Sequence, residues 1–218
     1  HEVRLPEYLN SDYRHDIKTP VGATTDVAKD LAARRFTGVV DVGILTMFYQ
    51  LPSVHPDRVR ILYSRDVAPS ELKNSPIVLL GTHESNPWVE IYETHMNFVF
   101  HDDLLHRNFS VINRSPHGDE LPRYDYDRLD PLHTVYGLAA LRPGLGTSGH
   151  ALILEGTSMA GTDAAAEFVF NDAQLLPFLK KIRNPNGSLP YFEVLLQSKS
   201  VNGDASQLKI VAYRTSRD

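Results

Sequence analysis

The sequence predicts an α/β protein whose open, mostly parallel but mixed sheet carries helices on both faces and ends in a C-terminal antiparallel hairpin. Two stretches have the order apolar strand, short polar turn, helix, which is typical of such sheets. In one, residues 76–80 lead into the turn 81–86, here named the first corner. In the other, residues 150–154 lead into the turn 156–161, which Thr162 and Asp163 follow; this turn together with Thr162 is here named the second corner. The third observation is the Val-Asn-Gly-Asp sequence of residues 201–204, a hairpin signal between the last two apolar segments.

The length and composition are those of an ordinary globular chain. Of its 218 residues, 42% are apolar and 22% are charged. This is enough to bury a sizeable core and is unlike the composition of a disordered chain. We expect residues 1–35 to form an N-terminal arm with a first helix. Residues 36–218 are expected to form a single α/β domain, with two lobes as the alternative.

Charge and cysteine content exclude several classes of protein. The net charge is −5 and no run of Lys and Arg exceeds two residues, so we expect no direct binding to nucleic acid. The chain has no cysteine, which excludes disulfides, zinc–thiolate sites and cysteine nucleophiles. No apolar stretch approaches the roughly 18 residues of a membrane span.

The chain begins with His1 instead of methionine, which favours a piece excised from a longer protein. Any targeting or membrane segment would then lie upstream. The compartment stays open, because the extracytoplasmic part of a membrane-anchored protein and a cytoplasmic protein both agree with the sequence.

The first third of the chain contains four predicted elements. Residues 26–35 form a helix that starts with an acidic first turn. The apolar run 39–51 suits a buried strand or a buried helix, and apolar side chains at i, i+4 and i+7 favour a helix from about Asp41. Alternation predicts a strand over residues 58–64, and residues 69–74 form a short helix.

Further elements follow the two corners. Asn86 and Pro87 start a helix, because asparagine can cap and proline suits the first helical position. Asn171 caps another helix, which contains Pro177 and ends at a turn of Pro, Asn and Gly. The segment 124–130, rich in Tyr and Asp, is expected to be a connection. Further strands are predicted over residues 96–101, 109–114, 134–141, 191–200 and 207–214.

The two corners form the candidate binding site. A helix N-terminus offers unpaired N–H groups and a partial positive charge, and glycine lets a ligand approach the backbone. Such a turn can hold a phosphate or a carboxylate. An arginine that directly follows a strand can bind a carboxylate through both of its terminal nitrogens. The candidate ligand-binding residues are Gly81, Thr82, Ser85, Asn86, Gly156, Thr157, Ser158, Thr162, Arg65 and Arg114.

Neither corner has a nucleotide fingerprint. They match neither GxxxxGK[ST] nor GxGxxG, and we predict no cofactor. Glu84, Glu155 and Asp163 lie in or beside the corners and count against a highly charged anion. The alternative interpretation is that both corners are only helix caps and tight turns.

Catalytic and metal-binding residues are not predicted. A serine hydrolase or transferase would use Ser158 with His83 or His150, but no G-x-S-x-G elbow occurs. The nearest metal-like group, residues 101–103 with His106, lacks the i, i+4 histidine pair of a helical zinc site. A solvated turn is the favoured interpretation of that group.

Several short strings carry a family resemblance. They are IVLLG at residues 77–81, SNPW at 85–88, MNF at 96–98, NRSPHGDE at 113–120 and GTSMAGTDAAAEF at 156–168. Together they resemble a family of uncharacterised bacterial α/β proteins with an ILLG…SNPW…LNF run, an NR.P..GE turn and a second corner of the form GTSMAGT-AA-EF.

The resemblance covers roughly residues 36–215 and departs from the family turn by the insertion of Asp119. In some members of the family the region is the C-terminal part of a longer chain, behind a DNA-binding winged helix or a membrane segment. The resemblance therefore implies a sensory or interaction module.

The leading hypothesis is a non-enzymatic ligand-sensing or protein-interaction domain of a larger bacterial protein. A small polar ligand or a protein partner would bind where the two corners adjoin. One alternative is the serine-dependent hydrolase or transferase. The other is a structural domain that forms a homodimer through its C-terminal hairpin.

Overall fold

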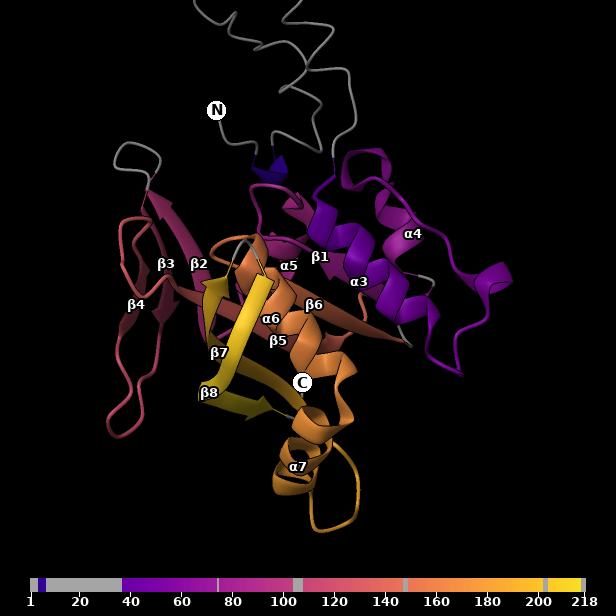
Figure 1. The fold of residues 1–218 in the computed structure, drawn as a ribbon. Coiled ribbons are helices and arrows are strands. Elements are labelled where there is room, and N and C mark those ends of the chain that lie inside the picture. Colours follow the sequence, from indigo (N-terminus) through magenta and orange to yellow (C-terminus); the bar gives the residue numbers. More distant parts are fainter. Residues whose placement is uncertain are drawn as a thin grey trace, which may run out of the picture.

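The structure is a computed structural model, and it describes residues 4–6, 37–73, 75–103, 108–146, 149–201 and 204–216. The helix predicted over residues 26–35 lies outside this part of the chain. Two β-sheets and the helices around them make up the described fold (Figure 1).

The larger sheet has five strands in the order β1-β6-β5-β7-β8. Their bounds are β1 Ile77–Leu80, β5 Thr134–Pro143, β6 His150–Gly156, β7 Tyr191–Val201 and β8 Asp204–Ser216. β1 pairs with β6 in parallel, whereas the other three pairs are antiparallel. The sheet is therefore mixed, and the prediction that it is mostly parallel is wrong. Short loops join β5 to β6 and β7 to β8, and such loops can join only antiparallel neighbours.

The C-terminal hairpin is confirmed as β7 and β8, which pair from Tyr191 with Ser216 to Val201 with Asp204. β8 forms one edge of the larger sheet. Dimerisation through this hairpin stays a prediction.

A second, antiparallel sheet has the order β2-β3-β4. Its strands are β2 Phe98–Asp103, β3 Asn108–Asn113 and β4 Arg123–Tyr126. The first two match predicted strands to within two residues, but β4 lies in the segment predicted as a connection. Only Tyr124 of β4 is buried, so the strand has almost no apolar pattern, and pairing with β3 decides its conformation.

The helices occupy the segments between the strands. They are α3 Val39–Tyr49, α4 Pro69–Lys73, α5 Glu90–Glu93, α6 Met159–Phe170 and α7 Asp172–Ile182, with 3-10 turns η2 Pro56–Arg58, η3 Ser64–Asp66 and η4 Pro87–Val89. The helix favoured from about Asp41 is confirmed as α3. Within the described ranges, no helix is both long enough and apolar enough to cross a lipid bilayer.

The strand predicted over residues 58–64 is wrong. This segment connects η2 to η3 and contains no strand. Ile61 and Leu62 are both exposed to solvent, so the alternation of apolar residues does not mark a buried face. A strand also needs a partner strand to bind its backbone groups, and this segment pairs with none in the described part of the chain.

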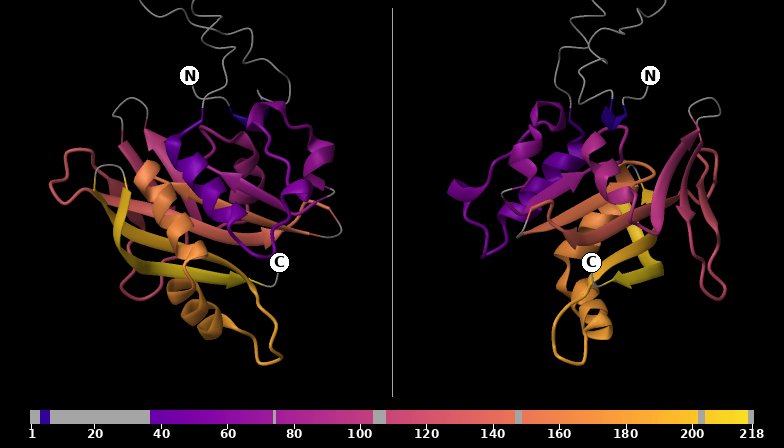
Figure 2. Two further views of the ribbon diagram at one scale, coloured as in Figure 1. Left: turned by 45° about the vertical axis from the view of Figure 1, so that its right-hand side comes forward. Right: turned by 180° about the vertical axis from the view of Figure 1, so that it is seen from behind.

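Two hydrophobic clusters lie on opposite faces of the larger sheet. On one face, Ile44 of α3, Phe168 of α6 and Phe178 of α7 pack on the strands. On the other face, Trp88 of η4 and Phe98 of β2 belong to the second cluster. The two views of Figure 2 show α6 along one side of the larger sheet. The prediction of helices on both faces is therefore confirmed only in part. One face is covered by helices, whereas the other is covered by the second sheet together with η4 and α5.

Candidate functional site

The two corners lie side by side at one edge of the larger sheet. β1 and β6 run in parallel with Leu80 opposite Leu154, and the Gly81 N–H donates to the carbonyl of Leu154 over 2.9 Å. The first corner follows Leu80 at the end of β1, and the second corner begins with Gly156, the last residue of β6, so the polar turns emerge at the same carboxyl edge. This is the relative placement that the proposed site requires.

The polar groups of the second corner serve the fold itself. Thr157 is buried, its hydroxyl accepts from the Tyr136 N–H over 3.0 Å, and its own N–H donates to the Tyr136 carbonyl over 2.9 Å. The Ser158 hydroxyl caps α6 by accepting from the Gly161 N–H, while the Thr162 hydroxyl donates to the Ser158 carbonyl. These contacts are the ones expected if the second corner is only a helix cap and a tight turn.

Gly156 at the second corner allows the first turn of α6 to pack closely against the backbone. A Cβ placed on Gly156 would lie 2.1 Å from the Thr162 nitrogen, a distance that no packed carbon can adopt. The space that the sequence suggests for a ligand is therefore occupied by the first turn of α6.

Polar groups of the first corner also form hydrogen bonds within the fold. Gly81 has φ of 85°, a conformation that glycine adopts without strain. The Ser85 hydroxyl and the Asn86 N–H both donate to the Thr82 carbonyl. The Asn86 amide donates to the Leu80 carbonyl over 3.2 Å, whereas its Oδ1 is buried without a hydrogen-bond partner among the described residues.

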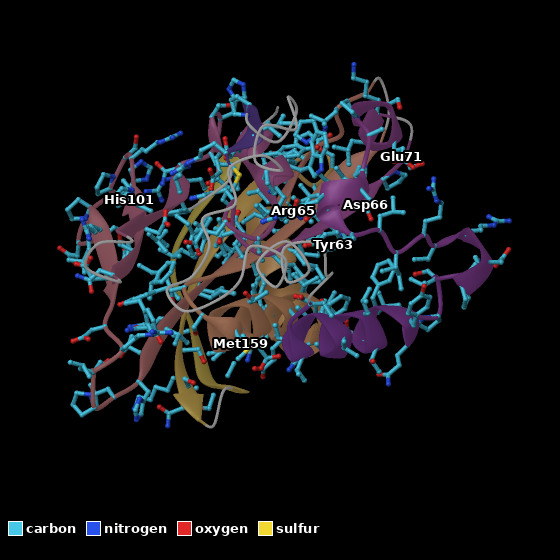
Figure 3. All side chains as sticks on the ribbon, turned by 90° about the horizontal axis from the view of Figure 1, so that it is seen from above. Tyr63, Arg65, Asp66, Glu71, His101 and Met159 are labelled. Carbon is cyan, nitrogen blue, oxygen red and sulfur yellow. The ribbon has the colours of Figure 1, made fainter. Side chains whose placement is uncertain are left out.

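The two predicted arginines lie in different places. Arg65 belongs to η3, which is joined to the first corner because the Ser64 hydroxyl donates to the Ser85 carbonyl. In the view from above, Arg65 lies with Asp66 (Figure 3). Arg114 follows β3, and its Nη1 donates to the carbonyls of Glu93 and Met96, each over 2.8 Å. The predicted ten-residue site is thus not brought together as one group.

An acid–histidine cluster extends from the first corner, and it consists of His83 of that corner with Glu93, Asp102 and Glu155. The His83 Nδ1 lies 3.1 Å from a Glu93 oxygen and its Nε2 lies 3.4 Å from an Asp102 oxygen. Burial acts to raise the pKa of Asp102, but hydrogen bonds with Glu84 and His83 hold it below its ordinary value. His83 is only 3% exposed, so the cluster joins the first corner to α5 and β2 without an opening to solvent.

Glu155 completes this cluster from the end of β6. It is fully buried, and neither carboxylate oxygen has a hydrogen-bond partner in the part of the chain that is described. Burial raises its pKa well above the ordinary value of 4.5, and the negative charges of Glu93 and Glu193 raise it further. No group of three or more His, Cys, Asp or Glu side chains among the described residues is arranged to hold a metal ion.

Neither of the two predicted histidines, His83 or His150, is arranged as a base for Ser158. Both ring nitrogens of His83 face carboxylates. His150 begins β6, whereas Ser158 follows the end of that seven-residue strand. At about 3.3 Å per residue the strand separates the two residues by roughly 20 Å.

A cavity of about 860 Å³ opens at the opposite edge of the larger sheet, where β6 begins and β5 ends. It lies between α5, the loop after β3 and the strands β5, β7 and β8. Its walls include Tyr92, Met96, Arg114, Arg142, Glu193 and Arg214. Of these, only Arg114 belongs to the predicted site. Arg142 and Arg214 stand in strands, where sequence reasoning assigned them no role.

Arg142 and Glu193 form the buried wall of this cavity. Arg142 is 5% exposed, and its Nη1 donates to the Ser216 hydroxyl over 3.0 Å and lies 3.8 Å from Glu193 Oε1. The other oxygen of Glu193 accepts the N–H groups of Asn97 and Phe98 over 2.8 and 3.0 Å. Burial raises the pKa of Glu193 in spite of these donors.

Arg214 is held by its own acid. Its two terminal nitrogens donate to both oxygens of Glu120, and its guanidinium lies 5.1 Å from the centre of the Phe98 ring. The hydrogen bond from Arg214 is the main reason that the pKa of Glu120 falls to about 2. Arg214 therefore shapes the cavity as part of an ion pair.

Comparison with known proteins adds no family to these observations. No protein-family model matches the chain, and no curated protein or solved structure matches it. The resemblance to uncharacterised bacterial proteins stays a prediction.

Proposed function

We propose that this chain is a non-enzymatic ligand-sensing domain whose small polar ligand binds in the cavity beside α5. The observation that carries the proposal is a cavity of about 860 Å³ whose lining includes arginines from three separate segments of the chain. Small-molecule sites in proteins usually occupy about 300–1,000 Å³ and combine apolar walls with a few convergent polar groups. Tyr92 and Met96 supply apolar surface here, and the arginines supply hydrogen-bond donors.

The corners are the weaker location for the ligand. Thr157, Ser158 and Thr162 already make hydrogen bonds within the fold, and a ligand would have to replace them. Buried polar groups that are already satisfied gain little from a new partner. In the cavity, the printed hydrogen bonds of the exposed Arg114 side chain all come from its Nη1, so we place the ligand at this edge of the sheet and not at the corners.

A thermal-shift screen with a cavity-blocking variant tests the proposal. The probes are neutral and charged metabolites of drug-like size, and a ligand at 100 times its Kd should add about 2.7 kcal/mol to the free energy of unfolding. Thr94, exposed on the cavity wall, is replaced in Thr94→Trp. The indole should occupy the part of the cavity beside α5, obstruct the ligand and abolish the shift.

Thr46→Trp is the matched control. Like Thr94, Thr46 is exposed and its hydroxyl donates to a carbonyl three or four residues earlier in the chain, but it lies on α3, away from the cavity. We expect this variant to keep the full ligand-induced shift. A shift that survives Thr94→Trp, or is lost equally in both variants, would contradict binding in the cavity.

A further inference from the structure

We propose that this chain has a second binding site, a groove between α7 and the free edge of β8 that binds an extended, acidic segment of a protein partner as an added strand of the larger sheet. The groove has a volume of about 490 Å³, and the described residues that line it are all different from those that line the cavity beside α5. This site is therefore independent of the proposed function.

The groove follows the outer edge of the larger sheet. β8 is the last strand in the sheet order, and β7 is its neighbour on the inner side. Four consecutive residues of β8, Ile210 to Tyr213, line the groove. Val211 and Ala212 belong to the hydrophobic cluster on one face of the sheet, whereas Tyr213 belongs to the cluster on the other face. A hollow that touches both sets lies along the edge of the strand.

This edge suits an extended peptide. β8 pairs with β7 in unbroken register from Ala212 to Ser216, and this part of the strand contains no proline. Alternate residues of an edge strand direct their backbone N–H and C=O groups away from the sheet. An added strand carries donors and acceptors at the same spacing, which is how β-augmentation binds peptides.

α7 provides apolar surface on one wall of the groove. Pro177 and Phe178 line it, and the Phe178 ring packs edge-on against Tyr213 with 5.6 Å between the ring centres. Ile210, in the same groove, is 37% exposed. Every second side chain of an added strand would face this wall, and an aromatic or branched apolar side chain there would remove the exposed apolar surface from water.

The charge of the groove favours an acidic partner. Lys181 is exposed, its Nζ lies 4.6 Å from the centre of the Tyr213 ring, and its ammonium group has no ion pair or hydrogen bond among the described residues. Glu120, the other charged residue of the lining, is held by Arg214 through both carboxylate oxygens. One positive charge is left, and a glutamate or aspartate of the partner complements it.

A second copy of this chain fits the edge less well. A symmetric contact between two β8 edges would bring the same residues of both copies together. The exposed Lys181 and Lys209 of one copy would then lie near those of the other. Like charges across an interface are unfavourable, so the charge at the edge favours a different, acidic chain.

Defined peptides test the groove on the full chain. The probes are fluorescein-labelled peptides of about ten residues, the length of a long strand, rich in threonine and valine with a central phenylalanine. One peptide also contains two glutamates, and two otherwise identical peptides contain two glutamines or two lysines in their place. Fluorescence anisotropy measures each Kd. We expect the glutamate peptide to bind about tenfold more tightly than the lysine peptide.

Charge reversal locates the acidic side chain. Lys181→Glu should reverse the preference, so that the lysine peptide binds more tightly than the glutamate peptide. Lys180→Glu is the matched control, because Lys180 is the neighbouring exposed lysine in the last turn of α7 and does not line the groove. It should keep the wild-type preference.

A second pair of variants blocks the groove sterically. Gln174→Trp, at an exposed position of α7 on the groove wall, should abolish binding of the glutamate peptide. Leu176→Trp is its control, because Leu176 is 55% exposed on the same helix and is not part of the lining. This variant should bind the peptide as the wild type does.

Hydrogen exchange distinguishes an added strand from a peptide that contacts α7 alone. The bound glutamate peptide should slow exchange of the outward-facing backbone amides of residues 211–215, because they donate to the added strand. Binding without protection of β8, failure of the glutamate peptide to bind, or an unchanged preference in Lys181→Glu overturns the proposal. A wild-type dimer in light scattering that Gln174→Trp converts to a monomer also overturns it, since the edge would then belong to a second copy.

Discussion

At the scale of single residues, two buried glutamates at opposite ends of the larger sheet differ in whether their carboxyl groups accept hydrogen bonds. Glu193 accepts two N–H groups and joins β7 to the start of β2. Glu155 accepts no hydrogen bond from any residue in the described ranges and lies near other acids. A buried carboxyl without donors is more stable as the neutral acid. Glu155 therefore makes the free energy of unfolding depend on pH.

The sign of this dependence follows from the raised pKa of Glu155. Between the ordinary value and the raised value, the folded chain binds a proton that the unfolded chain has released. The contribution of Glu155 is thus fully present below the ordinary value of 4.5 and is lost as the pH rises through the raised pKa.

We expect Glu155→Gln to match the wild type near pH 5 and to be more stable at pH 8, by on the order of 1–3 kcal/mol, because the amide never ionises. Urea denaturation at both pH values measures the difference. Glu167→Gln, at a half-buried position of α6, is the control and should keep the wild-type dependence on pH. Equal stability of Glu155→Gln and wild type at pH 8 would show that Glu155 does not destabilise the folded chain at that pH.

At the scale of elements, α6 is the helix that determines what the second corner can do. It packs across β5 and β6 at positions where glycine faces glycine. A Cβ on Gly161 would lie 2.3 Å from the Tyr136 carbonyl oxygen, and one on Gly137 would lie 2.2 Å from the Gly161 carbonyl oxygen. This close approach brings the start of the helix onto the sheet and leaves no room for a ligand beneath it.

A pair of glycine substitutions in two helices tests this packing. Gly161→Ala in α6 should destabilise the protein by about 1–3 kcal/mol, because the added methyl group overpacks a backbone contact. Gly43→Ala in α3 should instead stabilise it by about 0.5–1 kcal/mol, since a Cβ there meets nothing within 4 Å. Thermal unfolding of both variants gives the comparison. A neutral Gly161→Ala would mean that α6 stands further from β5 than the structure places it.

At the scale of the whole molecule, one hydrophobic cluster unites the two sheets. It contains Phe98 and Val111 from the smaller sheet together with Leu138 and Leu195 from the larger one. Trp88, the single tryptophan of the chain, is 2% exposed in the same cluster. Neither sheet can separate from the other without exposure of this shared core to water.

We therefore expect the two sheets to unfold in one transition. Trp88 fluorescence reports the shared cluster and far-UV circular dichroism reports the strands and helices, so their denaturation midpoints should coincide. Trp88→Phe, which should remove the fluorescence transition and keep that of the circular dichroism, verifies the origin of the signal. A fluorescence midpoint clearly below the other would show that the smaller sheet separates first.

Local signals predict the elements better than their arrangement. Asn171 accepts from the Ala173 N–H and caps α7, as its side chain predicts, and β7 pairs with β8 as the hairpin signal in the sequence predicts. The strand expected over residues 58–64 fails because alternation alone provides no pairing partner. β4 is missed for the opposite reason, since its conformation depends on β3 and its own residues are mostly polar.

The candidate site shows the same limit. Polar turns at the ends of β1 and β6 are visible in the sequence, but their hydrogen bonds are not, and these bonds show that Thr157 and Ser158 serve the fold. The cavity could not be found in advance. Arg114 directly follows β3 of the smaller sheet, whereas Arg142 lies 28 positions later in β5 of the larger sheet, and no spacing rule connects them.

The sequence by itself determined the α/β class, the two corners and the C-terminal hairpin, because capping, turn chemistry and apolar runs act between residues that are close along the chain. Tertiary structure alone decided which polar groups are satisfied and which arginines share a cavity. These properties depend on contacts between distant segments, such as the pairing of Glu193 with the backbone of Asn97. Burial then sets the strength of each charge, since the interior cannot solvate ions as water does.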